Sequence, residues 1–199
     1  MTYCIGIDEV GRGPVAGPVV VCACAIKQGV DIISFFPKEK LQDSKKLSEK
    51  NRREILEKIG NLVNQGDIFF GVGEVSALII DDIGISPSIK EAMDQALASL
   101  HLQGVPQESF IFLDGSLYAP VEYQQETIIK GDEKIPEIAL ASIYAKEFRD
   151  THMREIAKKY PEYNFERHVG YGTFAHYEEN RKNGLTDLHR RSFLKRLVN

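Results

Sequence analysis

The stretch IGIDEVGRGPVAGPVVV, residues 5–21, decides the fold because a short polar turn separates two apolar strand candidates in it. Asp8 and Glu9 stand where the first strand ends, and a Gly-Arg-Gly turn centred on Arg12 follows. Adjacent carboxylates repel each other unless a cation or a basic group lies close. Glycines on both sides of Arg12 let another molecule approach the backbone amides. The stretch predicts half of a divalent-metal site beside half of a phosphate or sugar clamp. The alternative is a solvated acid pair before a glycine turn.

The rest of the chain has an ordinary globular composition with an uneven charge distribution. Its 199 residues, 43% of them apolar, suffice for one domain with a proper core. The net charge is −4, but residues 151–199 hold ten Lys/Arg against six Asp/Glu, so +4 there leaves −8 for the remainder. An acidic front and a basic rear suit a metal site next to a phosphate-binding surface. A chance distribution of solvated charge is the alternative.

The three cysteines, Cys4, Cys22 and Cys24, lie in apolar strand-like runs and show no Cys/His metal spacing. Buried free thiols in a reducing cytoplasm are expected. The N-terminus lacks the features of a signal peptide, and the apolar run around residues 15–26 is too short to span a membrane. A cytoplasmic, monomeric protein without membrane contact is therefore expected.

Hydrophobic periodicity and capping residues predict alternating strands and helices. The chain should form one domain over residues 1–199, an α/β fold with a mixed central sheet flanked by helices, and a helical C-terminal part over about 160–199. Ser48, Ser86 and Thr173 are the expected helix N-caps. The expected strands are 3–8, 18–26, 67–75, 109–113 and 126–130, and the expected helices are 48–63, 76–83, 86–100, 136–159, 173–184 and 188–197.

Three of the apolar strands end in acid, at Asp8-Glu9, at Asp114 and at Asp132. If the three ends are neighbours, the carboxylates converge, and a hard cation is their natural partner. Carboxylates without histidine or thiolate ligands select Mg²⁺ or Mn²⁺. Two such ions about 3.5–4 Å apart would activate a water and stabilise the leaving oxygen of a phosphodiester. The alternative is that Asp114-Gly115 and Gly131-Asp132 are simple turns.

The segments DEVGRGPVAGPVV, DSKKLS, LDG, KGD, ASIYAKEFRD and HVGYGT occur in the order and spacing of ribonuclease HII, the prokaryotic type 2 ribonuclease H. The chain resembles this family from residue 5 to about residue 193, and DEVGRG with DSKKLS is the most specific part. The resemblance implies a ribonuclease H-like fold and endonucleolytic cleavage of RNA in RNA–DNA hybrids. It also implies cleavage 5′ to single ribonucleotides in duplex DNA, giving 3′-hydroxyl and 5′-phosphate ends.

The resemblance assigns roles to individual residues. Tyr171 would stack on the sugar at the RNA–DNA junction, whereas Val169 stands where many members have lysine, which puts a phosphate contact there in doubt. Lys45 and Lys46 would help hold the nucleic-acid backbone, with a solvated pair as the alternative. The metal-binding carboxylates would be Asp8, Glu9, Asp114 and Asp132, and the 2′-hydroxyl and adjoining phosphate would meet Gly11, Arg12 and Gly13.

Four further features receive a structural interpretation or a weaker functional one. The stretch GVGEVS at 71–76 resembles a dinucleotide fingerprint but lacks its third small residue. The pair Asp81-Asp82 is expected in a solvated loop, and Asp150 is expected to pair with Arg149 or Lys146. The run HRR at 189–191 is either solvated or on the nucleic-acid face, and the latter is preferred.

Two other functions compete with ribonuclease HII. Type 3 ribonuclease H shares much of the core but usually carries an extra N-terminal substrate-binding domain, for which Asp8 lies too near the start. A non-catalytic nucleic-acid-binding protein of the same fold would be favoured by loss of a carboxylate, and all four are present.

Overall fold

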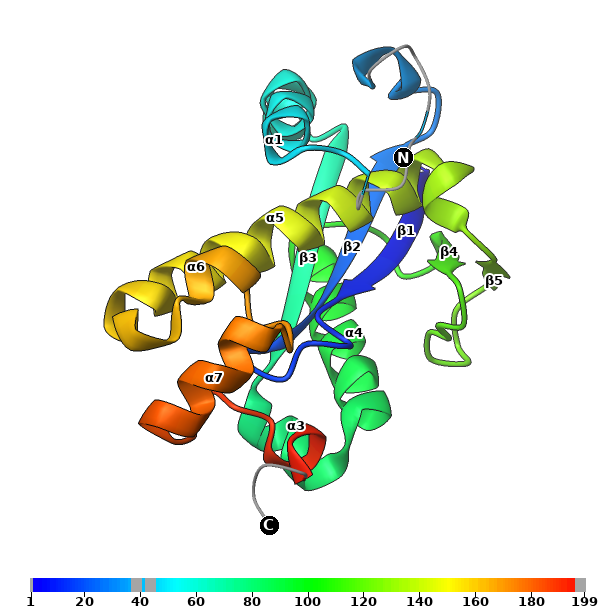
Figure 1. Cartoon of the computed structure of the whole chain (residues 1–199). Coiled ribbons are helices and arrows are strands. Elements are labelled where there is room, and N and C mark those ends of the chain that lie inside the picture. The colour runs from blue at the N-terminus through cyan, green and yellow to red at the C-terminus, as the bar shows by residue number, and fades with distance from the viewer. Residues whose placement is uncertain (1, 37–40, 42–45, 196–199) are drawn as a thin grey trace.

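The computed structural model describes residues 2–36, 41 and 46–195. Its centre is a mixed sheet in the order β3-β2-β1-β4-β5 (Figure 1). Antiparallel pairs join β1 to β2 and β2 to β3, whereas β1, β4 and β5 run parallel. The strands are β1 (Tyr3–Val10), β2 (Val19–Lys27), β3 (Ile68–Val75), β4 (Phe110–Asp114) and β5 (Gln125–Ile128).

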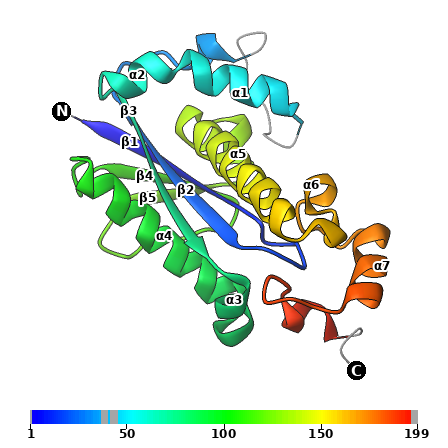
Figure 2. The same ribbon diagram turned by 90° about the vertical axis from the view of Figure 1, so that its left-hand side faces the viewer.

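The sheet lies between two helical layers (Figure 2). On one face, α4 (Ile85–Leu102) packs with α3 (Ala77–Ile83) beside it, and on the other lie α1 (Glu49–Lys58), α2 (Gly60–Asn64) and α5 (Pro136–Lys159). β2 is buried on both faces, since Val19 and Val21 belong to the core under α4 and Cys22 and Cys24 to the core under α5. The near-continuous apolar run of β2 follows from this double burial.

Glycines allow both long helices to approach the sheet closely. A Cβ on Gly6 would lie 2.1 Å from the backbone of Glu137 in α5. Cβ atoms on Gly71 and Gly73 would meet the carbonyl oxygens of Ala96 and Ala92 in α4 at 2.1 and 1.8 Å. The glycines of the GVGEVS stretch therefore serve helix packing and not dinucleotide binding.

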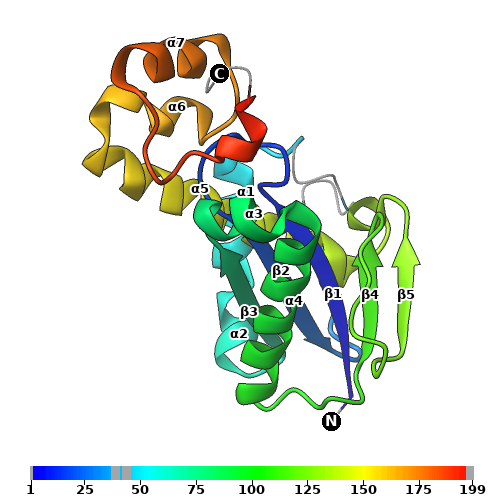
Figure 3. The same ribbon diagram turned by 90° about the horizontal axis from the view of Figure 1, so that it is seen from below.

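The C-terminal part is helical, as expected, and extends beyond the end of the sheet (Figure 3). It has its own apolar cluster, in which Met153 and Ala157 of α5 contact Tyr163, Phe165 and Ala16. Its elements are η4 (Pro161–Tyr163), α6 (Phe165–His168), α7 (Phe174–Asn183) and η5 (Arg191–Phe193).

Several element boundaries differ from the sequence predictions, and three of the differences concern helices. The helix expected over 48–63 is divided at Ile59, just before Gly60. α4 begins one residue before Ser86, because Gly84 supplies a positive φ of 87° and the Ser88 hydroxyl donates to the Gly84 carbonyl at 2.7 Å. Of the helix expected over 188–197, the structure describes residues 188–195, which form the short η5 and a helical residue at Lys195.

Candidate functional site

Asp8, Glu9 and Asp114 lie together at one end of the two central parallel strands. Ile7 of β1 pairs with Leu113 of β4, so the next residue of each strand is an aspartate. Asp8 is 8% exposed, and its pKa is raised well above the usual value by burial, then by Glu9 and, more weakly, by Asp114. Burial and Asp114 also raise the pKa of Glu9, against the lowering effect of Arg12. This mutual repulsion is the electrostatic environment that a bound cation would relieve.

Each of these carboxylates has protein partners. An Asp8 oxygen accepts a hydrogen bond from the Glu9 amide at 2.7 Å, and the Ser142 side chain of α5 also hydrogen-bonds to Asp8. Glu9 forms an ion pair with Arg12 at 3.6 Å. Asp114 accepts from the Gly131 amide at 2.6 Å. Ser142 is a residue that the sequence did not single out, although it lies in the ASIYAKEFRD segment.

Among residues 2–36, 41 and 46–195, no three Asp, Glu, His or Cys side chains are gathered closely enough to hold a metal ion. The donor set nevertheless suits a hard divalent cation, because it consists of carboxylate oxygens and includes one buried acid with a strongly raised pKa. The residues that could hold such a cation are Asp8, Glu9, Asp114 and Asp132.

Asp132 and Lys46 adjoin this cluster. Asp132 lies in η3 (Gly131–Glu133), directly after the glycine whose amide binds Asp114. Lys46 forms an ion pair with Glu133 at 3.2 Å, which brings the segment before α1 next to η3. Lys45 lies outside the described residues.

The Gly-Arg-Gly turn presents its central residue outward. The Arg12 side chain is 53% exposed, and a Cβ on Gly13 would meet nothing within 4 Å. Gly11 differs, because it is buried at a φ of 89° and its Cβ would lie 2.5 Å from the Nε of Arg149. Arg12 and Gly13 are thus open to a ligand, whereas the Cβ position of Gly11 is closed by packing.

Tyr171 lies on a segment that is tied to the same turn. The amides of Val15 and Ala16 donate to the Gly170 carbonyl at 2.9 and 3.2 Å. The Tyr171 side chain is 41% exposed. Val169 has a left-handed backbone with φ of 42° and packs against the C-terminal apolar cluster. Its side chain therefore offers no substitute for a lysine.

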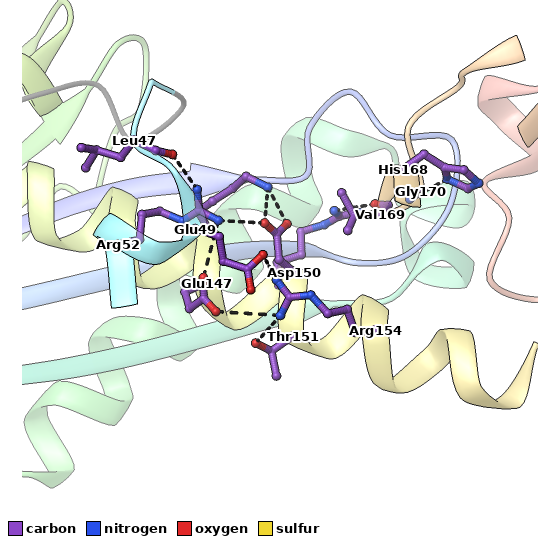
Figure 4. A network of polar contacts seen from close by, with 12 residues as sticks. Leu47, Glu49, Arg52, Glu147, Asp150, Thr151, Arg154, His168, Val169 and Gly170 are labelled. Atoms are coloured by element: carbon purple, nitrogen blue, oxygen red, sulfur yellow. Dashed lines mark hydrogen bonds and ion pairs between the residues drawn. The ribbon is translucent and has the colours of Figure 1, made fainter. Parts of the chain in front are cut away.

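The ASIYAKEFRD segment contributes a buried network on α5. Asp150 pairs with Lys146 at 2.5 Å, as expected, and also with Arg52 of α1 at 3.2 Å. Figure 4 shows Arg52 between Asp150 and Glu147, and its Nη2 pairs with both carboxylates. Arg149, the other expected partner, is fully buried and donates instead to backbone carbonyls.

Two surface expectations are wrong. His189 and Arg190 of the HRR run are 1% and 0% exposed, so these two residues do not form a nucleic-acid surface. Asp81 lies in α3 and not in a loop, and its carboxylate accepts from the amides of Arg191 and Ser192 at 2.7 and 2.9 Å. It thereby fixes η5 to α3.

Known proteins resemble this chain in sequence. The sequence model of the family "Ribonuclease HII" matches residues 5–196. A ribonuclease HII of Chlamydia caviae is 45% identical over 188 residues, which is 94% of this chain and 82% of that protein. A ribonuclease HII of Bacillus cereus is 45% identical over 193 residues, 97% of this chain and 69% of that protein.

Solved structures agree with the sequence comparison. The ribonuclease HII of Archaeoglobus fulgidus, solved with PCNA, is 25% identical, with a TM-score of 0.70 and coverage of 94% and 93%. Ribonuclease H2 of Pyrococcus horikoshii has the same fold, with a TM-score of 0.73, 22% identity and full coverage of both chains. Bst-RNase HIII in complex with Mn²⁺ also shares the fold, with a TM-score of 0.69 at 20% identity over 99% of this chain and 69% of that one. The chain therefore belongs to the ribonuclease HII family and is a type 2 ribonuclease H, a metal-dependent endoribonuclease.

Proposed function

We propose that this chain cleaves the RNA strand of RNA–DNA hybrids and also nicks duplex DNA on the 5′ side of a single embedded ribonucleotide. The single observation that carries the proposal is the cluster of Asp8, Glu9 and Asp114 at the ends of β1 and β4, next to the exposed Arg12. A charged, partly buried cluster beside an exposed guanidinium suits a phosphodiester and its 2′-hydroxyl neighbour.

Asp8, Glu9, Asp114 and Asp132 would hold two divalent cations, Mg²⁺ or Mn²⁺. When bound, such cations lower the pKa of a water and stabilise the leaving oxygen. The four carboxylates would position the scissile phosphate through the cations that they hold. The hydrogen bond from Ser142 would orient Asp8. Water would attack phosphorus, the bond to the 3′ oxygen would break, and that oxygen would take up a proton. The products are a 3′-hydroxyl and a 5′-phosphate.

Residues outside the carboxylate cluster would choose the substrate. Arg12, with Gly11 and Gly13, would contact the 2′-hydroxyl and the adjoining phosphate, and Tyr171 would stack on the sugar at the junction. Lys45 and Lys46 would hold the backbone of either duplex by charge.

We further propose that the chain acts as a monomer in the cytoplasm, with residues 1–199 as one catalytic domain. The cytoplasmic location is supported by the three cysteines, which are free thiols, two of them fully buried. None of the helices in the described segments has the length and apolar character needed to cross a bilayer.

The test is nicking of a DNA duplex with one embedded ribonucleotide, compared with cleavage of a continuous RNA–DNA hybrid and an all-DNA duplex. Mg²⁺ or Mn²⁺ should be required, and ends should be mapped on both sides of the cut. Cleavage of the hybrid alone would point to a type 3 activity. Binding without cleavage in either metal would point to a non-catalytic nucleic-acid-binding protein.

A further inference from the structure

Arg149 of α5 is a fully buried cation that binds three separate backbone segments. Its Nε donates to the Pro18 carbonyl at 2.9 Å, its Nη2 to the Ala16 carbonyl at 3.1 Å and its Nη1 to the Val169 carbonyl at 2.8 Å. Within the described chain, no carboxylate forms an ion pair with its guanidinium. The desolvated charge is balanced by carbonyl dipoles, which ties its position to the course of the backbone.

The backbone is wrapped tightly around this guanidinium. Added Cβ atoms at Gly11, Gly17 and Gly170 would lie 2.5, 3.2 and 3.4 Å from the nearest Arg149 side-chain nitrogen. All three glycines have positive φ angles, between 84° and 89°. Residues with side chains would strain all three positions, and a side chain at Gly11 would also displace Arg149.

A second buried arginine, Arg190, acts on the same turn. Its Nε donates to the Gly17 carbonyl at 2.9 Å and its Nη1 to the carbonyl of Arg12 at 3.3 Å. Its own amide donates to the Val15 carbonyl at 2.8 Å. Two buried guanidiniums thus hold the backbone of the turn that carries the exposed Arg12 side chain.

The same contacts fix Tyr171 relative to Arg12. The Gly170 carbonyl accepts from the amides of Val15 and Ala16, while Arg149 holds the carbonyl of the preceding residue, Val169. Residues 11–18 and 168–171 therefore form one body around Arg149. The two segments are far apart along the chain, so these direct hydrogen bonds and those of the Arg149 guanidinium together define their spacing.

We propose that Arg149 is a positioning residue that sets the spacing between Arg12 and Tyr171, and thereby the selectivity for a ribonucleotide at an RNA–DNA junction. This proposal rests on the function proposed above. Arg12 and Tyr171 would read the 2′-hydroxyl and the junction sugar of the same site, so a shift between them should impair junction nicking most. Cleavage of a continuous hybrid tolerates such a shift, because neighbouring ribonucleotides can occupy the site in other registers.

The test compares Arg149→Lys with Leu100→Ala. Lysine keeps the charge but cannot reach three carbonyls in the geometry of the planar guanidinium. Leu100 is fully buried in the core under α4 and belongs to neither segment, so its truncation destabilises the fold without touching them. The selectivity ratio is the nicking rate at one embedded ribonucleotide divided by the cleavage rate of a continuous hybrid. Arg149→Lys should lower this ratio about tenfold or more, with a rise in KM for the junction substrate, whereas Leu100→Ala should preserve it.

Hydrogen–deuterium exchange gives a readout that does not depend on catalysis. Arg149→Lys should speed exchange in peptides covering 11–18 and 168–173 together, and Leu100→Ala in peptides of α4. If Arg149→Lys does not fold, Arg190→Lys replaces it and should loosen 11–18 more than 168–173.

An unchanged selectivity ratio in a folded, active Arg149→Lys enzyme would overturn the proposal, as would an equal fall of the ratio in Leu100→Ala. Unchanged exchange in both segments would overturn it as well. A wild-type protein that cleaves neither substrate would instead refute the proposed function, so the two failures are distinguishable.

Discussion

At the scale of single residues, two buried aspartates have opposite surroundings. Asp8 lies beside Glu9 and Asp114, and its pKa is raised first by burial and then by these two acids. Asp150 lies between Lys146 and Arg52, which satisfy its charge by ion pairs. A charge that its neighbours repel does not stabilise the fold, so we assign Asp8 to ligand binding. Asp150, whose charge is paired, is assigned to holding the fold together.

Asparagine substitutions should therefore change stability in opposite directions. Asp8→Asn removes a repelled buried charge and should stabilise the metal-free protein. Asp150→Asn leaves two cations without their partner and should destabilise it by about 3–5 kcal/mol. Urea unfolding in the presence of a chelator measures both, and a loss of stability in Asp8→Asn would contradict this assignment.

The same Asp8→Asn variant should lose nicking activity in Mg²⁺ while keeping or gaining affinity for the hybrid. The substitution removes a ligand charge and relieves repulsion toward phosphates. Asp94→Asn, at an exposed position on α4, is the control for a neutralised surface acid. Circular dichroism should show both variants folded, and near-normal nicking by Asp8→Asn would exclude it as a metal ligand.

Tyr171 offers a half-exposed ring on a fixed segment, which suits stacking better than general attraction. Tyr171→Ala should reduce nicking at a single ribonucleotide much more than binding to all-DNA duplex, since ring stacking is worth roughly 1–3 kcal/mol. Tyr171→Phe keeps the ring and is the matched control. The measurements are the nicking rate at a single ribonucleotide and the affinity for all-DNA duplex, for both variants. If Tyr171→Ala lowers both by the same factor, Tyr171 is a packing residue.

At the scale of elements, the predictable part of the fold depends on local pattern. The apolar run of β2, the acids near the C-terminal ends of β1 and β4, and the extent of α5 are all visible as periodicity and strand-end chemistry. The role of Arg149 is not visible in this way, because its acceptors Ala16 and Pro18 lie 133 and 131 residues away. A weak signal exists: Arg149 lies in an i+4 row of buried α5 residues with Ala145 and Met153, where a charge is unexpected.

The C-terminal part contains a cluster of three buried histidines that the sequence did not reveal. The rings of His168 and His176 stack at 4.3 Å, and the Nε2 atoms of His176 and His189 are 3.2 Å apart. His176 Nδ1 donates to the Tyr171 carbonyl, so its Nε2 must accept from His189. Burial lowers the pKa of both His176 and His189 to about 4, so the network is neutral at physiological pH.

This cluster predicts acid sensitivity. The folded-state pKa values lie below the unfolded value near 6.5, so the stability contributed is present above that pH and is lost as pH falls toward about 4. Unfolding free energies between pH 7.5 and 4 should fall less steeply in His176→Phe, which cannot titrate. His152→Gln is a contrasting variant outside the cluster: the Glu74 hydrogen bond raises the pKa of His152, so its loss removes an opposing contribution and should make the fall steeper.

The raised pKa of Asp8 acts with the opposite sign, because protonation there favours the folded state. The pH series is therefore best measured in the Asp8→Asn background. Parallel slopes for that background with and without His176→Phe would contradict a role of the cluster in acid sensitivity.

At the scale of the whole molecule, residues 151–199 present less positive charge on the surface than their excess of Lys and Arg implies. Arg190 is buried, and Lys158, Arg181 and Lys182 pair with glutamates three residues before them. With a net charge of −4, the protein cannot attract nucleic acid by bulk charge. Attraction must come from a few cations near the carboxylate cluster.

Lys46 is such a cation, since its pair with Glu133 brings it beside the Asp132 segment. Lys46→Ala should weaken binding to RNA–DNA hybrid and all-DNA duplex alike, because a phosphate contact carries no sequence information. If one phosphate contact is lost, the slope of log K against log salt should become shallower by about 0.9. Glu133→Gln removes a nearby negative charge and should strengthen binding to both duplexes.

Lys158→Ala is the matched control. Lys158 is paired to Glu155 near the C-terminal end of α5, so its substitution should leave the slope unchanged. Affinities of all three variants over a salt series give the result. A steeper or unchanged slope in Lys46→Ala would show that Lys46 serves only its pair with Glu133, and the cations that hold the duplex would then have to be sought elsewhere on the molecule.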